Sequence, residues 1–253
     1  KMLKKRIIPL LLISDRRLIK PVKFSEYRDV GDPVKTAQIY SDSDADELII
    51  LNIDRKKKNI DDLTNHLNKI VERCFVPISA GGGIESLEDA IKIIKSGADK
   101  IVLNSICFRK TNVPHSIVQE LGSQAVVASI DLKIINNQYV LFSENGKKQI
   151  TDNLKKHLDF LNFLKVGEIF VNSIDLEGTM LGPDNQLIKI IKDNTELPII
   201  YSGGIGTYDH IKSIFQSFDI NAVACGSIFN FTDTNPIRLK SYLNSHKLNF
   251  RIF

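Results

Sequence analysis

The chain has 253 residues, of which 43% are hydrophobic and 25% charged, and its formal net charge is +4. This is an ordinary composition for a soluble globular domain, large enough to form a core without disulfides or a structural metal. The charge is too small to argue for nucleic acid, and no apolar run approaches the ~20 residues of a membrane span.

Buried apolar segments alternate with helical patterns along the chain. The first, Arg6–Ile13, reads RIIPLLLI and is typical of a strand buried on both faces of a parallel sheet. The polar segment Ser14–Val30 is predicted to be a long loop. The next expected elements are helix Asp32–Ser43, strand Glu47–Ile53, helix Ile60–Cys74, strand Val76–Ala80, helix Glu85–Ser96, strand Lys100–Asn104, helix Asn112–Leu121, strand Gln124–Asp131, a hairpin over Leu132–Ile150, helix Asp152–Leu164, strand Glu168–Asn172 and helix Pro183–Asn194. A further strand–helix–strand unit follows, and helix Asn235–Ser245 closes the chain.

One unit of the pattern occurs twice. Val76–Ser105 reads strand, Gly-Gly turn, helix, strand and polar end, and Leu197–Ser227 repeats it, so that Pro77 and Pro198 lie 121 positions apart. The segments ELIILNID and EIFVNSID align at the same offset. The chain therefore looks like two similar halves of about four βα units each.

Eight strands alternating with eight helices predict one (β/α)8 TIM barrel over residues 1–253, built from half-barrels of approximately 1–122 and 123–253 with a β-hairpin inserted after strand 5. An open doubly wound sheet is the alternative, but no G-x-G-x-x-G follows the first strand.

The two Gly-Gly turns predict two phosphate sites. Backbone amides at such turns bind phosphate, because glycine permits close approach and the next helix begins there. All of these positions fall at the expected carboxyl ends of strands, where barrel enzymes hold their active sites. The alternative is that they are simply tight turns. The expected phosphate-binding residues are Gly82, Gly83, Asn104 and Ser105 in one half, and Gly203, Gly204, Gly226 and Ser227 in the other.

Asp131, at the expected end of the fifth strand, is a candidate general acid or base. A capping or loop carboxylate is the alternative. Its counterpart in the other half is Leu12, which cannot transfer protons.

Four charged residues open four of the expected strands at the opposite mouth: Arg6, Glu47, Lys100 and Glu168. Alternating charges around one mouth would form a paired ring, either as a structural plug or as a gate through the barrel axis. The basic residues of the Ser14–Val30 loop, including Lys20, suit either a lid over an anionic ligand or a solvated loop.

The three cysteines are widely spaced, with no CxxC pair. We expect no metal site, no cofactor and no disulfide, and a reducing, cytoplasmic location.

These residues together resemble the HisF family, the cyclase subunit of imidazole glycerol phosphate synthase, over nearly the whole chain. The matching segments are KRIIP, GDPV, DELI, GGGI, GADK, GSQAVV, SID, EGT and SGG, in family order. The resemblance implies a lyase of histidine biosynthesis without a cofactor. A HisH-like glutaminase subunit docks on the N-terminal face, ammonia passes a charged gate and the barrel axis, and a substrate with two phosphates reacts at the other face.

The resemblance also assigns residues. Arg6, Glu47, Lys100 and Glu168 match the gate, and Asp99 matches a position that faces the glutaminase. Asp131 matches one of two catalytic aspartates, and Lys20 matches a mobile-loop lysine. Asp175, Gly178 and Thr179, in the SID and EGT segments, join the expected substrate-binding residues.

The chain departs from the family at the catalytic rim. Leu12 stands where the family has its other catalytic aspartate, Asn52 and Glu177 each replace an aspartate, and QIT replaces the usual NTG near residue 150. This pattern resembles HisF-like paralogues of surface-polysaccharide loci, which are thought to supply ammonia for sugar amidation. Two further hypotheses are a non-catalytic scaffold that activates a glutaminase and a phosphosugar isomerase. Leu12 argues against the isomerase, which needs two opposed carboxylates.

Overall fold

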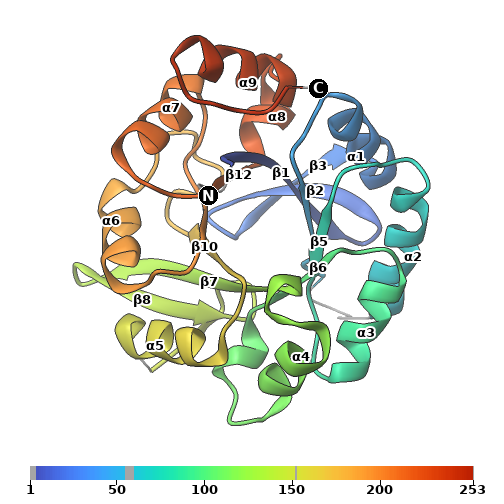
Figure 1. Cartoon of the computed structure of the whole chain (residues 1–253), viewed down its shortest axis with the longest axis vertical. Coiled ribbons are helices and arrows are strands. Elements are labelled where there is room, and N and C mark those ends of the chain that lie inside the picture. The colour runs from blue at the N-terminus through green and yellow to red at the C-terminus, as the bar shows by residue number, and fades with distance from the viewer. Residues whose placement is uncertain (1–3, 55–59, 152, 253) are drawn as a thin grey trace.

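Eight parallel strands close into a barrel in the computed structural model, which describes residues 4–54, 60–151 and 153–252. Neighbouring strands pair around the ring, and pairing between the sixth and the fifth strand closes it (Figure 1). The predicted TIM barrel is confirmed. Its strands are β1 (Arg6–Ser14), β4 (Leu48–Asn52), β5 (Ile78–Gly81), β6 (Lys100–Leu103), β7 (Val126–Ile135), β10 (Glu168–Ser173), β11 (Ile199–Ser202) and β12 (Ala222–Cys225).

Helices surround the barrel, and several of them begin at a capping side chain. Asp32 and Asn235 accept hydrogen bonds from backbone amides at two helix starts, and Ser86 with Asp89 forms a reciprocal capping box. The helix predicted from Pro183 begins two residues later, because Asp184 caps it. The helices are α1 (Pro33–Asp42), α2 (Ile60–Val71), α3 (Leu87–Lys95), α4 (Val113–Leu121), α5 (Leu154–Leu164), α6 (Asn185–Asn194), α7 (Tyr208–Ser217), α8 (Ser227–Phe231) and α9 (Pro236–Ser245), with short 3₁₀ turns η1 (Ser105–Phe108) and η2 (Ser123–Ala125). The predicted start of α5, Asp152, lies outside the described residues.

Alternating strand residues build two cores. In β1, Ile7 and Leu11 face the helices, whereas Ile8, Leu10 and Leu12 face the barrel interior. The interior cluster draws one or two residues from most of the other strands, among them Val127 and Phe170. This alternation follows from the pleat, and apolar residues on both faces are what a parallel sheet covered by helices requires.

The segment Ser14–Val30 is not the predicted loop. It forms an antiparallel hairpin of β2 (Arg17–Val22) and β3 (Glu26–Gly31), and β2 pairs with the end of β1. The prediction failed because Lys20 and Pro21 read as loop residues, although both are buried in β2.

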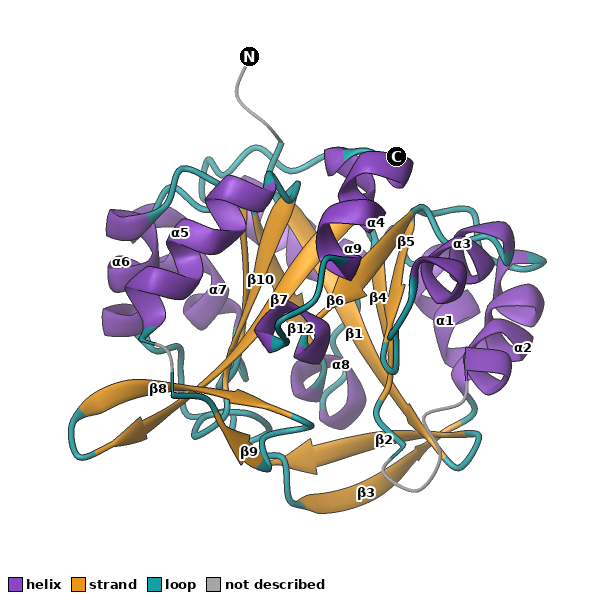
Figure 2. Ribbon diagram, turned by 90° about the horizontal axis from the view of Figure 1, so that it is seen from below, coloured by secondary structure: helices purple, strands orange, loops and turns teal. Residues whose placement is uncertain are grey.

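A second hairpin confirms the predicted insertion after the fifth strand. It forms because β7 continues past the barrel and pairs with β8 (Gln138–Ser143), which meets β9 (Lys148–Gln149). Figure 2 shows both hairpins crossing the same end of the barrel, opposite the N-terminus. No helix among the described residues is long and apolar enough to span a membrane. The three cysteines are free thiols and buried.

The second Gly-Gly turn leaves no room for a side chain. Gly204 has φ of +73°, and a Cβ built there would lie 1.8 Å from the carbonyl oxygen of Gly182. Gly122 has a similar φ of +82°, but a Cβ there would meet nothing within 4 Å. A substitution at Gly122 therefore tests backbone strain alone, whereas one at Gly204 tests backbone strain together with steric crowding.

Gly122→Ala should lower the free energy of unfolding by about 1–3 kcal/mol, because its φ of +82° and ψ of 151° lie in a backbone region that is essentially restricted to glycine. Gly204→Ala should cost at least about 2 kcal/mol more, because the carbonyl must move. Urea denaturation of both variants measures the difference. Equal losses would show that the turn tolerates the methyl group.

Candidate functional site

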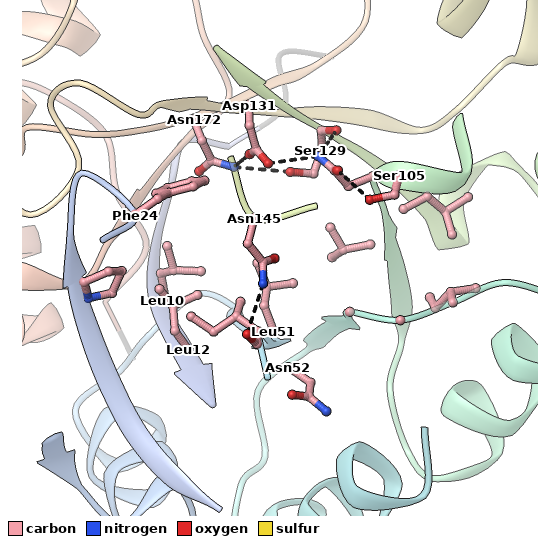
Figure 3. Close-up of a pocket in the computed structure, with 18 of the residues that line it drawn as sticks. Leu10, Leu12, Phe24, Leu51, Asn52, Ser105, Ser129, Asp131, Asn145 and Asn172 are labelled. Carbon is pink, nitrogen blue, oxygen red and sulfur yellow. Dashed lines mark hydrogen bonds between the residues drawn. The ribbon is translucent and has the colours of Figure 1, made fainter. Parts of the chain in front are cut away.

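A pocket opens at the C-terminal mouth of the barrel, where both hairpins converge. It encloses about 980 Å³, including its open mouth. One wall is polar and the opposite wall apolar, as Figure 3 shows. The polar wall consists of Asn104, Ser105, Ser129, Asp131 and Asn172, and the apolar wall includes Leu10, Leu12, Leu51 and Val102.

Asp131 is buried and is held by two amides. Asn172 Nδ2 donates to one carboxylate oxygen at 2.8 Å, and Asn104 Nδ2 donates to the other at 3.1 Å. β7 continues to Ile135, so Asp131 lies inside that strand and not at its end as predicted. It nevertheless lies opposite Asn172, one residue before the pairing of β7 with β10 ends. Both oxygens are therefore fixed toward the pocket wall.

Burial raises the pKa of Asp131 to about 6. The two amide donors lower it and the nearby Glu177 carboxylate raises it further, but loss of hydration is the largest cause. A carboxyl group with a pKa near the working pH suits general acid–base catalysis. The predicted acid/base residue is thus in a suitable place with a suitable pKa.

Leu12 lies on the pocket wall that faces Asp131 in Figure 3. It is 6% exposed and packs with the interior cluster. Leu10 and Leu51 flank it on the same wall. At this position the pocket has an apolar surface, so Asp131 lacks the opposed carboxylate that a two-carboxylate mechanism would use.

The first Gly-Gly turn opens into the pocket. Gly82, Gly83, Asn104 and Ser105 all line it. Gly82 has φ of +104°, and a Cβ there would lie 2.0 Å from the carbonyl oxygen of Asn52, so only glycine fits. Ser105 Oγ donates weakly to Asn104 Oδ1 at 3.3 Å. The fold thus brings the first set of predicted phosphate-binding residues together at the pocket.

The second turn is covered. Gly203, Gly204, Gly226 and Ser227 are all buried, and none of them lines the pocket. Lys20, which is 2% exposed, forms an ion pair with Glu177. A Cβ built on Gly226 would lie 2.8 Å from Lys20 Nζ, so the lysine sits against this turn.

Ser227, the residue after Gly226, has a buried Oγ without a hydrogen-bond partner among the described residues. An ammonium group beside an unsatisfied hydroxyl is suited to an anion. The expected mobile-loop lysine is therefore a strand residue, held beside the second turn by a buried carboxylate.

Asp175, Gly178 and Thr179, the predicted substrate-binding residues of the SID and EGT segments, lie outside the pocket. Asp175 accepts a hydrogen bond from the Ile134 amide at 2.8 Å and so holds the second hairpin. Gly178 packs against the Pro21 carbonyl, and Thr179 Oγ1 donates to Leu176 O at 2.8 Å. None of the three lines the pocket in this structure.

Several residues that line the pocket were not predicted from the sequence. Ser129 and Asn172 point inward beside Asp131, and the period-2 pattern of their strands could have indicated them. Asn145, in the turn after β8, reaches across the mouth, where its Nδ2 donates to Ile53 O at 3.0 Å. Phe24 comes from the hairpin that was predicted as a loop. No local signal tells which distant strand a turn will cover.

At the opposite mouth the four predicted charges form a closed ring. Arg6 Nη1 lies 2.7 Å from Glu47 Oε2 and Nη2 lies 3.0 Å from Glu168 Oε1, while Lys100 Nζ lies 3.0 Å from Glu47 and 3.5 Å from Glu168. Arg6, Lys100 and Glu168 begin their strands, and Glu47 directly precedes β4.

Burial disfavours the charge on Arg6, but Glu168 and Glu47 outweigh it and raise the pKa of Arg6 above its usual value. Arg6 therefore keeps its charge in the ring. Glu168 Oε2 is buried with no hydrogen-bond partner in the described part of the chain. Asp99, beside Lys100, accepts a hydrogen bond from the Ile78 amide at 2.8 Å. No group of three or more metal-binding side chains occurs within residues 4–54, 60–151 and 153–252.

Asp131 should make stability depend on pH. Its folded pKa of about 6 is above the unfolded value of 3.8, so the folded state binds more protons between these values. The free energy of unfolding therefore falls as pH rises from about 4 to 6, and this group contributes about 3 kcal/mol to the fall. Asp131→Asn should remove that fall.

Urea denaturation of both proteins between pH 4 and pH 8 gives the comparison, and its readout is the difference in pH slope. Parallel slopes for the two proteins would show that Asp131 is ionised over the whole range.

Comparison with known proteins gives one consistent family. The family model described as histidine biosynthesis protein matches residues 6–235. A protein of Pseudomonas aeruginosa named "Putative imidazole glycerol phosphate synthase subunit hisF2" is 38% identical over 98% of this chain and 99% of its own. The imidazole glycerol phosphate synthase subunit HisF of Thermotoga sp. strain RQ2 is 35% identical over 99% of each chain.

The protein of the same name from Exiguobacterium sibiricum is also 35% identical, over 99% of this chain and all of its own. The resemblance drawn from the sequence segments is therefore confirmed over the barrel as a whole. The chain belongs to the HisF family of imidazole glycerol phosphate synthase subunits.

Proposed function

We propose that this chain is the ammonia-using subunit of a glutamine amidotransferase complex, with a HisF-type cyclase (lyase) active site whose catalytic rim is altered. The observation that carries the proposal is the closed ring of Arg6, Glu47, Lys100 and Glu168 at the mouth opposite Asp131. A ring of this kind is costly to bury, because each charge loses hydration. A barrel that needed only stability could fill this mouth with apolar side chains instead.

The chemistry of the ring suits ammonia. Glu168 Oε2 is an acceptor that no described residue uses, so it can receive a hydrogen bond from a small donor that enters the mouth. Beyond the ring, Ile8, Val127 and Phe170 belong to the apolar interior. Neutral ammonia enters such surroundings far more readily than ammonium. A HisH-like glutaminase docked on this face would supply ammonia where bulk water does not dilute it.

The acceptor pocket suits a phosphorylated substrate. Gly82, Gly83 and Ser105 offer one phosphate position at the pocket edge, and Asp131 lies on the adjacent wall. A second phosphate would bind at Gly226 and Ser227 after Lys20 exchanges Glu177 for the phosphate. In this proposal Asp131 transfers protons at the reacting centre, and its raised pKa allows it to act as an acid and as a base near neutral pH.

A second candidate shares the ammonia path but differs in the acceptor. Leu12 removes the opposed carboxylate that cyclisation uses, which favours a paralogue that passes ammonia on to another reaction, such as sugar amidation for a surface polysaccharide. The Pseudomonas aeruginosa relative, whose name marks it as a second HisF, supports this candidate. The scaffold hypothesis is weaker, because the first phosphate turn and Asp131 remain together in an open pocket.

The proposal is tested by supplying the ribulosyl bis-phosphate substrate with ammonium salt and following its loss. The wild-type chain should turn over slowly, and Leu12→Asp should raise the rate by about 10²–10⁴, the usual contribution of one acid–base group. The matched control is Leu10→Asp, which places a carboxylate on the same wall two residues earlier and should not raise the rate.

Fast wild-type turnover would reject the altered rim. If Leu12→Asp gains no more than Leu10→Asp, the missing carboxylate is not the cause of slow turnover. If neither variant consumes the substrate although both bind it, the chain uses another acceptor and the second candidate stands.

A further inference from the structure

Two hydrogen bonds, one to the backbone and one to a side chain, join the start of β1 to the segment directly before β4, next to Arg6 and Glu47. Asp46 N donates to Ile7 O at 3.3 Å, and Ile7 N donates to Asp46 Oδ2 at 2.8 Å. β1 and β4 pair from Leu10 and Ile49 onward, so this clasp continues their contact to the mouth of the barrel. We call the two bonds between Asp46 and Ile7 the clasp.

Lys240, from the last helix, holds the other oxygen of Asp46. Its side chain is fully buried, and its Nζ lies 3.1 Å from Asp46 Oδ1 and 2.8 Å from Asp44 Oδ2. A buried ammonium is stable only when it is paired, because it has lost its hydration. Asp46 therefore serves two partners at once, the Ile7 amide on one oxygen and Lys240 on the other.

The same clasp recurs around this mouth. Asp99, directly before Lys100, accepts from the Ile78 amide at 2.8 Å and donates its own amide to Ile78 O at 2.8 Å. Asn221, directly before β12, makes the equivalent pair of bonds with Ile199. Of these three clasps in the described residues, the one at Asp46 is also tied to a buried lysine.

We propose that Lys240 is a positioning residue that, through the Asp46 clasp, sets the separation of Arg6 and Glu47 in the ring. Arg6 directly precedes Ile7 and Glu47 directly follows Asp46, so each ring residue is one peptide unit from the clasp. The 2.7 Å contact between Arg6 and Glu47 therefore depends on a cation contributed by α9. The inference rests on the proposed function insofar as the ring admits ammonia.

Removing Lys240 should disturb the ring without touching the pocket. Asp44 and Asp46 would be left as two largely buried carboxylates without their cation, and Asp46 would turn away from the Ile7 amide or take up a proton. The first residues of β1 and the segment before β4 would then separate. Asp131 and Gly82 lie at the other mouth and make no contact with this cluster.

The test compares two nitrogen sources in the complex with its glutaminase subunit, with the ribulosyl bis-phosphate as acceptor. In Lys240→Met, glutamine-driven turnover should fall by about 10- to 100-fold, because small misplacements of reacting or guiding groups have effects of this size. Ammonium-driven turnover should not change, and Lys240→Arg should restore much of the loss. The matched control is Lys212→Met, which removes a lysine paired with Asp209 on α7 and should leave both rates unchanged. A parallel fall in both rates, or no fall, would overturn the proposal.

A second variant tests the proposal if Lys240→Met fails to fold, and a second readout tests it if the proposed function is wrong. The double variant Asp44→Asn/Lys240→Met has one unpaired carboxylate fewer than Lys240→Met. It should show the same change as Lys240→Met in the ratio of the glutamine-driven to the ammonium-driven rate. If the wild-type complex shows no turnover with either source, the proposed function fails, and the clasp is tested by amide hydrogen exchange at Ile7. Exchange should quicken in Lys240→Met and in the double variant but not in Lys212→Met; equal protection in all three contradicts the positioning role.

Discussion

The pairing of β10 with β7 closes the barrel and orders both of its mouths. Its register sets Glu168 beside Val127 at one end and Asn172 beside Asp131 at the other. A shift of one residue would turn Glu168 and Asn172 out of the interior, because successive side chains point to opposite faces of a strand. The charged ring and the fixed carboxylate therefore depend on one register, although they lie at opposite ends of the strands.

The two similar halves of the chain share their glycine turns but differ in the chemistry around them. Both Gly-Gly turns survive with positive φ, at Gly83 and Gly204 as at their neighbours. The first turn opens into the pocket, whereas Lys20 and Glu177 cover the second. Asp131 in one half faces Leu12 in the other. Burial raises the pKa of Asp131, which lies in the same pocket as the apolar side chain of Leu12.

The fold followed from the sequence because apolar runs mark the barrel strands, and a Gly-Gly turn follows two of them, β5 and β11. The ring followed because strand starts meet at one mouth, so that Arg6 and Glu168, far apart in the sequence, had to be neighbours. The hairpin of β2 and β3 did not follow, because its polar residue Lys20 is buried against Glu177, a partner 157 positions away that no local pattern indicates. The covering of the second turn could not be predicted for the same reason. Asn145 reaches the pocket only through the tertiary path of its hairpin.

Isotope labelling tests the central claim, that ammonia from glutamine crosses the ring to the pocket. The complex is given amide-¹⁵N glutamine, the bis-phosphate acceptor and unlabelled ammonium in solution, and the nitrogen in the product is read by mass spectrometry after a single turnover. The account predicts a product that keeps the ¹⁵N of glutamine with little dilution by the solution ammonium. A product labelled in proportion to the mixed pool would contradict it, because the nitrogen would then have entered from solvent at the other mouth.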